Sequence, residues 1–163
     1  MVDILRRAGI DISMISINGK KKVTGAHGIA LDTDEDIVQC DPDKLDMLVL
    51  PGGMPGTTNL AACEKLTEAL KKADQEKRGI AAICAAPSVL GDLGFLKGKK
   101  AVCYPGFESR LTGAEVLAVP VVTDGHITTS RGMGTAIAFA LELTKRLKDE
   151  ETAKQVGRSL IYN

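Results

Sequence analysis

The sequence predicts a single α/β domain in which a mostly parallel sheet is covered by helices on both faces. Two short apolar runs, MLVL at 47–50 and GIAAI at 79–83, have the length and composition of strands buried on both sides. Between them, residues 59–78 place leucines on one helical face and charges on the other. Buried strands that alternate with amphipathic helices are typical of such a fold, and its ligands bind beyond the carboxyl ends of the strands.

The N-terminal part of the chain reads as a helix followed by extended segments. Residues 2–9, VDILRRAG, form an amphipathic pattern that ends in glycine, a common helix C-terminus. IDISMISI at 10–17 alternates and is rich in β-branched residues, which predicts a strand. VTGAHGIALD at 23–32 predicts another extended segment, broken by Gly25 and Gly28. Because alternating α/β chains usually open with a strand, either this helix comes first or a leading strand is absent from the sequence.

The second half of the chain continues the alternation. We expect a short helix at 87–94 with a proline in its first turn, and a strand at 98–104. VPVVTDGHITTS at 119–130 predicts two strands around an Asp-Gly turn, which is a strong hairpin signal. A long helix at 134–148 and a shorter one at 150–160 complete the order.

The composition suits one small domain, residues 1–163, and disfavours several classes of function. Lys and Arg number 21 and Asp and Glu number 21, so no net charge favours nucleic acid or an anionic membrane. No apolar run reaches the about 20 residues of a membrane-spanning helix, and the charges in MVDILRR do not fit a signal peptide. We therefore expect a cytoplasmic protein with no nucleic-acid or membrane partner.

The four cysteines lack CxxC spacing, which indicates free thiols in a reducing cytosol rather than a zinc site or a disulfide framework. No metal and no cofactor are expected. Cys84 stands where a buried strand becomes a helix, and this environment makes a thiol nucleophilic and oxidisable. Cys40, Cys63 and Cys103 have no such placement, and we interpret them as small buried hydrophobic residues.

The segment LPGG at 50–53 is the second candidate for chemistry. Gly52 and Gly53 follow a buried strand, where glycine lets the backbone approach a ligand and direct N–H groups at developing negative charge. Alone, the motif is also compatible with a simple tight turn. Together with Cys84 at the end of another strand, it predicts an oxyanion site.

Three further residues are weaker candidates. A nucleophilic cysteine usually needs a base, and the chain has two histidines. His126 follows the Asp-Gly turn and is interpreted as a solvated hairpin residue. His27, in GAHG, lines the site or is an ordinary exposed loop residue. Arg131 binds an anionic substrate group or forms a surface ion pair. The RGMGTA that begins at Arg131 has imperfect dinucleotide-binding spacing and follows the last strands, so nucleotide binding is rejected.

The motifs LPGG, AAICAAPSVL and TTSRGMGTA, together with VDILRRAGI, VTGAHGI and VCYPGFE, resemble the ThiJ/PfpI family, specifically its branch of small parkinsonism-associated deglycase-like proteins. The resemblance covers essentially the whole chain. It implies a flavodoxin-like three-layer α/β sandwich, similar to class I glutamine amidotransferases, with the reactive cysteine on a strained elbow and a homodimeric assembly. Cys84 matches the nucleophile of that family, and the amides of Gly53 and Ala85 match its oxyanion-stabilising positions.

Proteins of this family are credited with glutathione-independent glyoxalase activity, deglycation, redox sensing and chaperoning, and older names refer to thiazole biosynthesis. We therefore predict a cysteine-dependent enzyme acting on a small-molecule aldehyde or glycated substrate. The alternative is a redox sensor or chaperone whose Cys84 is oxidised to sulfinate without turnover, and a third reading is a non-catalytic interaction module. Peptidase and amidotransferase activities are discounted, because Ala85 replaces a histidine and no glutamate closely follows His126.

Two departures from the family pattern matter. The glutamate that exchanges protons with the cysteine lies after the first strand of the family, and its counterpart falls upstream of Met1. We therefore expect one leading strand of the sheet to be absent from the sequence and the native gene product to be longer. The histidine on the segment after the elbow is also missing, because the matching region, SRLTGAEV at 109–116, contains none.

Overall fold

Four strands form the central sheet of the computed structural model, which describes residues 1–162. Their order is β5–β6–β10–β9; the first three are parallel, and β9 runs antiparallel to β10. Ile80 pairs with Leu48 on one side and with Ile127 on the other. The prediction of a mostly parallel sheet is confirmed. The bounds are β5 (Met47–Leu50), β6 (Gly79–Ile83), β9 (Val121–Asp124) and β10 (Ile127–Ser130).

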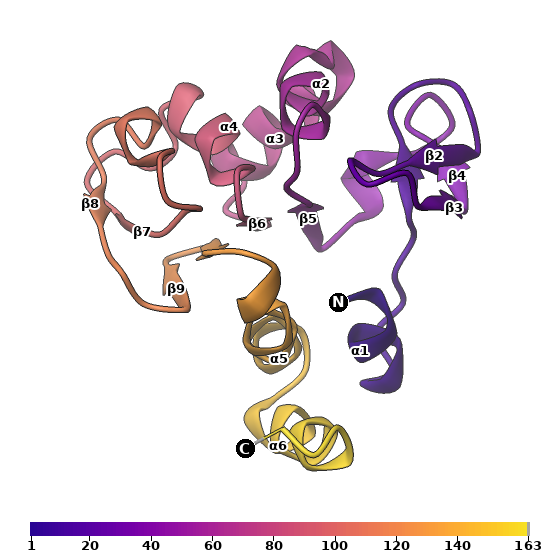
Figure 1. Ribbon diagram of the computed structural model, residues 1–163, viewed down its shortest axis with the longest axis vertical. Helices are drawn as coiled ribbons and strands as arrows, with labels where there is room; N and C mark the ends of the chain where they lie inside the picture. The colour runs from indigo at the N-terminus through magenta and orange to yellow at the C-terminus, as the bar shows by residue number, and fades with distance from the viewer. Residues whose placement is uncertain (163) are drawn as a thin grey trace.

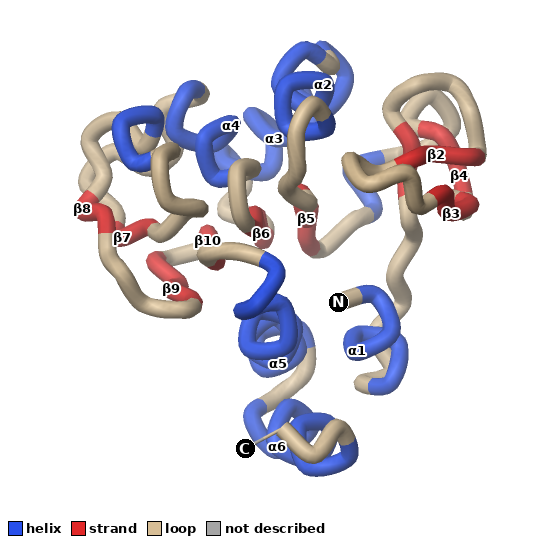
Figure 2. Tube along the Cα trace, in the orientation of Figure 1, coloured by secondary structure: helices blue, strands red, loops and turns tan. Residues whose placement is uncertain are grey.

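Helices cover both faces of this sheet, which gives the three-layer, flavodoxin-like sandwich expected from the sequence (Figure 1). Helices α2, α3 and α4 lie on one face, α1 and α5 lie on the other, and α6 packs on the outer side of α5 (Figure 2). The bounds are α1 (Val2–Arg7), α2 (Gly56–Ala62), α3 (Glu64–Gln75), α4 (Pro87–Asp92), α5 (Ala136–Leu147) and α6 (Glu150–Ser159).

The side chains of β6 alternate between the two cores. Ile80 packs in a cluster with Leu70 of α3 and Leu90 of α4, whereas Ala81 packs with Phe139 of α5 on the opposite face. All five side chains are fully buried. Burial of each large apolar side chain contributes about 1.5–3 kcal/mol. The absence of polar residues from GIAAI therefore follows from a strand that is covered on both sides.

The remaining strands are short and lie outside this central sheet. The strand predicted at 10–17 is reduced to two residues, and the segment predicted at 23–32 is a β2–β3 hairpin, because Gly28 adopts a φ of +79° in its turn. The strand predicted at 98–104 is also reduced to two residues. The bounds are β1 (Ile15–Ser16), β2 (Lys22–Thr24), β3 (Ala30–Asp32), β4 (Glu35–Asp36), β7 (Lys100–Ala101) and β8 (Glu115–Val116), with 3₁₀ helices η1 (Pro42–Lys44), η2 (Glu108–Arg110) and η3 (Met133–Thr135).

Two other expectations need correction. The helix predicted at 59–78 is interrupted at Cys63, whose backbone is extended with ψ 102°, so it forms the separate helices α2 and α3. His126 is not solvated: it is 9% exposed, and its Nε2 lies 2.7 Å from Oδ1 of Asp74 on α3. The Asp-Gly hairpin around it is confirmed, with Gly125 at a φ of +62°.

The outer edge of β5 is open, since β6 is the only strand paired with it among the described residues. Ile10 and Ile12, before β1, pack toward the α5 core. Ile15 in β1 and Ile17 just after it pack toward the α3 core. This segment therefore contributes to both cores, as a strand of the sheet does, yet it is not hydrogen-bonded to β5.

Candidate active site

Cys84 occupies a strained elbow between β6 and α4. Its φ of +65° lies in the left-handed region, where a residue other than glycine costs about 1–2 kcal/mol. Two hydrogen bonds hold this backbone in place: the Cys84 amide donates to the carbonyl of Ser130 at 2.9 Å, and its carbonyl accepts from the amide of Tyr104 at 2.8 Å. The side chain is half-buried. The backbone of the elbow is thus held in place at a residue that is not fully buried.

The LPGG loop packs directly against this elbow. A Cβ atom added to Gly52 would lie 2.5 Å from Cβ of Cys84, 2.7 Å from the carbonyl oxygen of Ile83 and 3.1 Å from the amide nitrogen of Ala85. Glycine is therefore required at this position to let the two loops approach. The structure brings Gly52, Cys84 and Ala85 together, as the sequence motifs predicted.

The amides predicted to stabilise an oxyanion flank the same place. Gly53 has a φ of +92°, and its carbonyl accepts hydrogen bonds from the amide and the hydroxyl of Thr57 at 2.8 and 3.0 Å. Within residues 1–162, neither the Gly53 amide nor the Ala85 amide donates to another group of the chain. Both N–H groups are consequently available to a bound ligand.

Arg131 and His27, the two predicted substrate-binding side chains, lie in different surroundings. Arg131 directly follows Ser130, the residue that accepts from the Cys84 amide, and is half-buried. His27 is exposed in the turn of the β2–β3 hairpin, and no hydrogen bond or ion pair among the described residues joins it to the elbow. The structure therefore brings Arg131, but not His27, into the neighbourhood of Cys84.

The other cysteines have the buried character expected of them, except Cys63. Cys103 is 4% exposed, and burial, followed by the charge of Glu108, raises its pKa to about 11. Cys40 is also buried, and burial raises the pKa of its thiol. Cys63 is half-buried at the break between α2 and α3. All four are free thiols.

Three exposed apolar residues lie on the loops that meet at the elbow. Met54 follows Gly53 and is 46% exposed, and Tyr104, bonded to the Cys84 carbonyl, is 50% exposed. Met133, after Gly132, is 92% exposed. A Cβ atom on Gly132 would lie 3.4 Å from the Tyr104 ring, so the Tyr104 and Arg131 loops are in contact. The sequence motifs contained these residues, but no pattern in them signalled a shared location.

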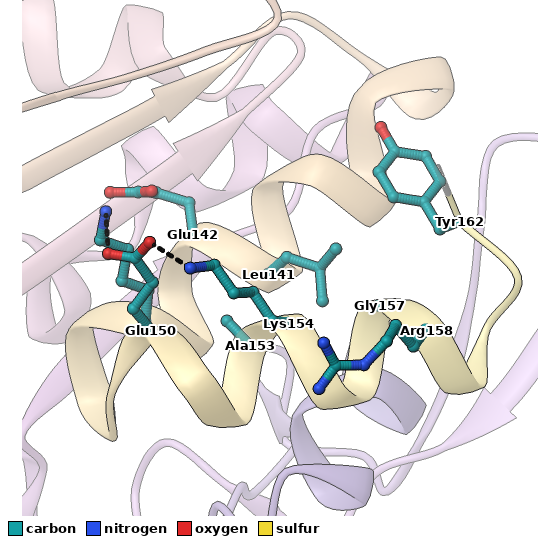
Figure 3. Close-up of a pocket in the computed structure, with 9 residues that line it drawn as sticks. Leu141, Glu142, Glu150, Ala153, Lys154, Gly157, Arg158 and Tyr162 are labelled. Atoms are coloured by element: carbon teal, nitrogen blue, oxygen red, sulfur yellow. Dashed lines mark ion pairs between the residues drawn. The ribbon is translucent and has the colours of Figure 1, made fainter.

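A groove of about 420 Å³ lies between α5 and α6 and contains none of the predicted site residues (Figure 3). Lys154 and Glu150 form an ion pair of 2.8 Å at one end, and Tyr162 stands at the other. Among residues 1–162, no three His, Cys, Asp or Glu side chains gather as metal ligands. None of the helices in this range combines the length and apolar character needed to span a membrane.

Comparisons with known proteins bear on the identity of this elbow. Residues 1–146 match the model of the DJ-1/PfpI family. Protein DJ-1 homolog B of Arabidopsis thaliana is 39% identical over 99% of this chain. This chain spans only 37% of the length of homolog B and 42% of the length of homolog A. Deglycase PfpI of Pyrococcus furiosus is 34% identical over 88% of this chain and 87% of its own length.

The fold is shared with solved structures as well. A structure of oxidized Toxoplasma gondii DJ-1 superimposes with a TM-score of 0.94 at 35% identity, and the match covers 99% of this chain and 88% of the other. The family model and the solved relatives thus agree with each other over most of this chain. The chain belongs to the DJ-1/PfpI family.

Proposed function

We propose that this protein is a cysteine-dependent enzyme that acts on small reactive carbonyl compounds, as a glyoxalase or a protein deglycase. The observation that carries the proposal is the close approach of Gly52 to Cys84. A Cβ atom added to Gly52 would lie only 2.5 Å from Cβ of Cys84, so the loop that carries the unpaired Gly53 amide packs against a half-buried cysteine. Such packing is costly to maintain and has no evident use in a purely structural cysteine.

The chemistry follows from these groups. The thiolate of Cys84 adds to the aldehyde carbon of a 2-oxoaldehyde, so that a C–S bond forms and the carbonyl electron pair moves to oxygen. The amides of Gly53 and Ala85 donate to this oxyanion, and removing one such donor typically costs about 100- to 1000-fold in turnover. The product of this step is a hemithioacetal. The later proton transfer needs an acid–base group near the thiol.

The surroundings support a small, partly apolar substrate. Met54, Tyr104 and Met133 provide exposed apolar surface on the loops around the thiol, which suits the methyl group of methylglyoxal. Arg131, next to the elbow, offers a positive charge to an anionic group of a substrate or product. His27 remains a weaker candidate because it lies on the exposed hairpin. The deglycase names of the Pyrococcus relatives favour the same substrate class.

We propose further that the protein works as a homodimer in the cytoplasm. The free thiols of all four cysteines are compatible with a reducing compartment. The assembly is checked by sedimentation of the purified protein, for which a monomer at micromolar concentration would contradict the dimer.

The experiment that tests the proposed activity is D-lactate formation from methylglyoxal by the full-length protein. We expect turnover in the wild type and its loss in Cys84→Ser, since a hydroxyl is a far weaker nucleophile than a thiolate. Cys63→Ser is the matched control, because Cys63 is also half-buried but lies between α2 and α3. Undiminished turnover in Cys84→Ser would refute the mechanism.

A redox sensor is the second candidate, and one comparison favours it: the Toxoplasma gondii relative was solved in an oxidized form. In this function Cys84 is oxidised and no substrate turns over. Mass spectrometry after mild peroxide treatment, combined with the D-lactate assay, separates the two candidates. Oxidation confined to Cys84 in a protein without carbonyl turnover supports the sensor, whereas D-lactate formation supports the enzyme.

A further inference from the structure

A second thiol lies beside the elbow. The amide of Tyr104 donates to the carbonyl of Cys84 at 2.8 Å, so the backbone of the residue before it, Cys103, runs alongside Cys84. The Cα atoms of Cys103 and Cys84 each lie two covalent bonds from this hydrogen bond, so they are separated by at most about 8 Å. Disulfides form at Cα separations of about 4.4–6.8 Å. The backbone therefore brings the two cysteines into the range from which a disulfide can form.

The electrostatic surroundings of Cys103 agree with this placement. Burial is the main cause of the raised pKa of the Cys103 thiol, and a charge on Cys84 adds to it. The positive charge of Arg131 acts in the opposite direction on the same thiol, as does the Phe107 amide. The surroundings of the Cys103 thiol therefore include both the cysteine of the elbow and a cation.

The two thiols differ strongly in accessibility. Cys84 is half-buried at a strained backbone position, whereas Cys103 is 4% exposed and packs within the core on the α3 and α4 face. A solute that oxidises thiols reaches Cys84 first. Cys103 is buried from solvent and lies next to Cys84 in the fold. An accessible thiol beside a buried one is the arrangement of a peroxidatic cysteine, here Cys84, and a resolving cysteine, here Cys103.

We propose that Cys103 is a resolving thiol that converts oxidised Cys84 into a reversible intramolecular disulfide. In the first step the Cys84 thiolate attacks a peroxide, the O–O bond breaks, and the sulfur is oxidised by two electrons to a sulfenic acid while hydroxide leaves. In the second step the Cys103 sulfur attacks that of Cys84, the S–OH bond breaks, and the leaving hydroxide takes the Cys103 proton to form water.

Neither of the other cysteines fits this role. Cys40 follows β4, and its carbonyl accepts from Lys65 of α3, away from the elbow. Cys63 separates α2 from α3, and its amide bonds to Leu60. No hydrogen bond among the described residues links either one to the backbone of residues 83–85.

The disulfide protects the nucleophile. A sulfenic acid without a nearby thiol proceeds to sulfinic acid, which reductants such as dithiothreitol do not reverse. With Cys103 adjacent, oxidation stops at a bond that thiols reduce. This consequence for turnover rests on the proposed function, because only an enzyme that uses Cys84 is switched off and on by it. The formation of the bond does not depend on that function.

The test is peptide mapping of the full-length protein after a small excess of hydrogen peroxide, without reduction. Trypsin separates the two cysteines into peptides 79–97 and 101–110. We expect these peptides to be cross-linked and the intact mass to fall by two hydrogen atoms, both reversed by dithiothreitol. The D-lactate assay on the same samples reports separately on the proposed function, so that a cross-link in a protein without turnover leaves the resolving role intact.

The matched variants are Cys103→Ser and Cys63→Ser. In Cys103→Ser the same peroxide dose adds two oxygen atoms to Cys84 that dithiothreitol does not remove, whereas Cys63→Ser retains the cross-link. If Cys103→Ser fails to fold, Cys103→Ala and the wild-type cross-link decide the question. Irreversible sulfinate at Cys84 in the wild type, without a cross-linked peptide, would overturn the proposal.

Discussion

Reactive side chains at the two ends of the central strands have opposite surroundings. At the amino end of β10, His126 is buried and its ring contacts the Asp74 carboxylate at 2.7 Å, so its polar group is satisfied within the protein. At the carboxyl end of β6, the backbone of Cys84 is held by two hydrogen bonds, yet its sulfur makes none among the described residues. The amino end therefore holds a structural contact, whereas the carboxyl end has the features expected of a ligand site.

This difference shows that burial and hydrogen bonding of the side chain separate the two roles better than residue type. A histidine after a turn and a cysteine after a strand are both candidates for chemistry. His126 is joined to α3 by a partner 52 residues away, and it therefore ties two elements together. Cys84 is instead approached by glycine backbone, and no side chain among residues 1–162 forms a hydrogen bond with its sulfur.

The largest expected effect is that of Gly52→Ala. Its Cβ would overlap Cβ of Cys84 at 2.5 Å and the Ile83 carbonyl at 2.7 Å, so the LPGG loop and the elbow must separate. Overpacking of this kind costs about 1–3 kcal/mol in the free energy of unfolding, and a displacement of about 1 Å reduces turnover on the order of 100-fold. Urea unfolding and the D-lactate assay measure the two effects.

Gly134→Ala is the control for this substitution, because a Cβ atom there meets nothing within 4 Å and its φ is not positive. It is expected to leave both measurements near the wild-type values. If Gly52→Ala retained full turnover, the close contact at the carboxyl end would have no functional meaning, and the contrast with the His126 end would fail.

The second prediction concerns the amino end. His126→Ala removes the partner of the Asp74 carboxylate and is expected to lower the free energy of unfolding by about 1–3 kcal/mol while leaving turnover per folded molecule unchanged. A double-mutant cycle with Asp74→Ala isolates the pair, for which we expect a coupling of about 0.5–3 kcal/mol. Loss of turnover without loss of stability would show that the two ends are not independent.

The parts of the fold that local pattern determines were predictable. The strands at 47–50 and 79–83 match the structure residue for residue, because a short run without polar side chains has few alternatives to a strand buried on both faces. The position of Cys84 at a strand-to-helix junction was predictable for the same reason: the run ends at Ile83, and Pro87 begins a helix.

The parts that depend on distant residues were not predictable. His126 follows a turn, which favours exposure, and only Asp74 on α3 explains its burial. Helical periodicity continues through Cys63, so the break between α2 and α3 left no local signal. The hydrogen bond from the Tyr104 amide to the elbow and the contact of the Tyr104 ring with Gly132 arise from the packing of separate loops. Each of these features is set by tertiary structure.

The smallest expected effect lies far from both ends, at the start of α6. The Asp149 carboxylate caps this helix by accepting from the Thr152 amide at 2.7 Å, and this hydrogen bond holds the pKa of Asp149 below its usual value. Because the folded-state pKa is lowered, the stabilisation is present above the unfolded pKa of about 3.9 and is lost as the pH falls through the folded value. Asp149→Asn keeps a capping oxygen that does not titrate.

Asp149→Asn is therefore expected to match the wild type in urea unfolding near pH 7 and to lose less stability than the wild type when the pH is lowered to about 3. Other carboxylates titrate in both proteins, so the difference between the two acid-induced losses is the quantity that reports on this cap. Helix α6 packs on α5 and α1, on the outer side of the helical layer, which predicts unchanged D-lactate formation at neutral pH. An equal loss of stability in the two proteins would show that this cap is not a source of acid sensitivity. Altered turnover in Asp149→Asn would show that a change at α6 affects Cys84, which would contradict the local character assigned to the elbow.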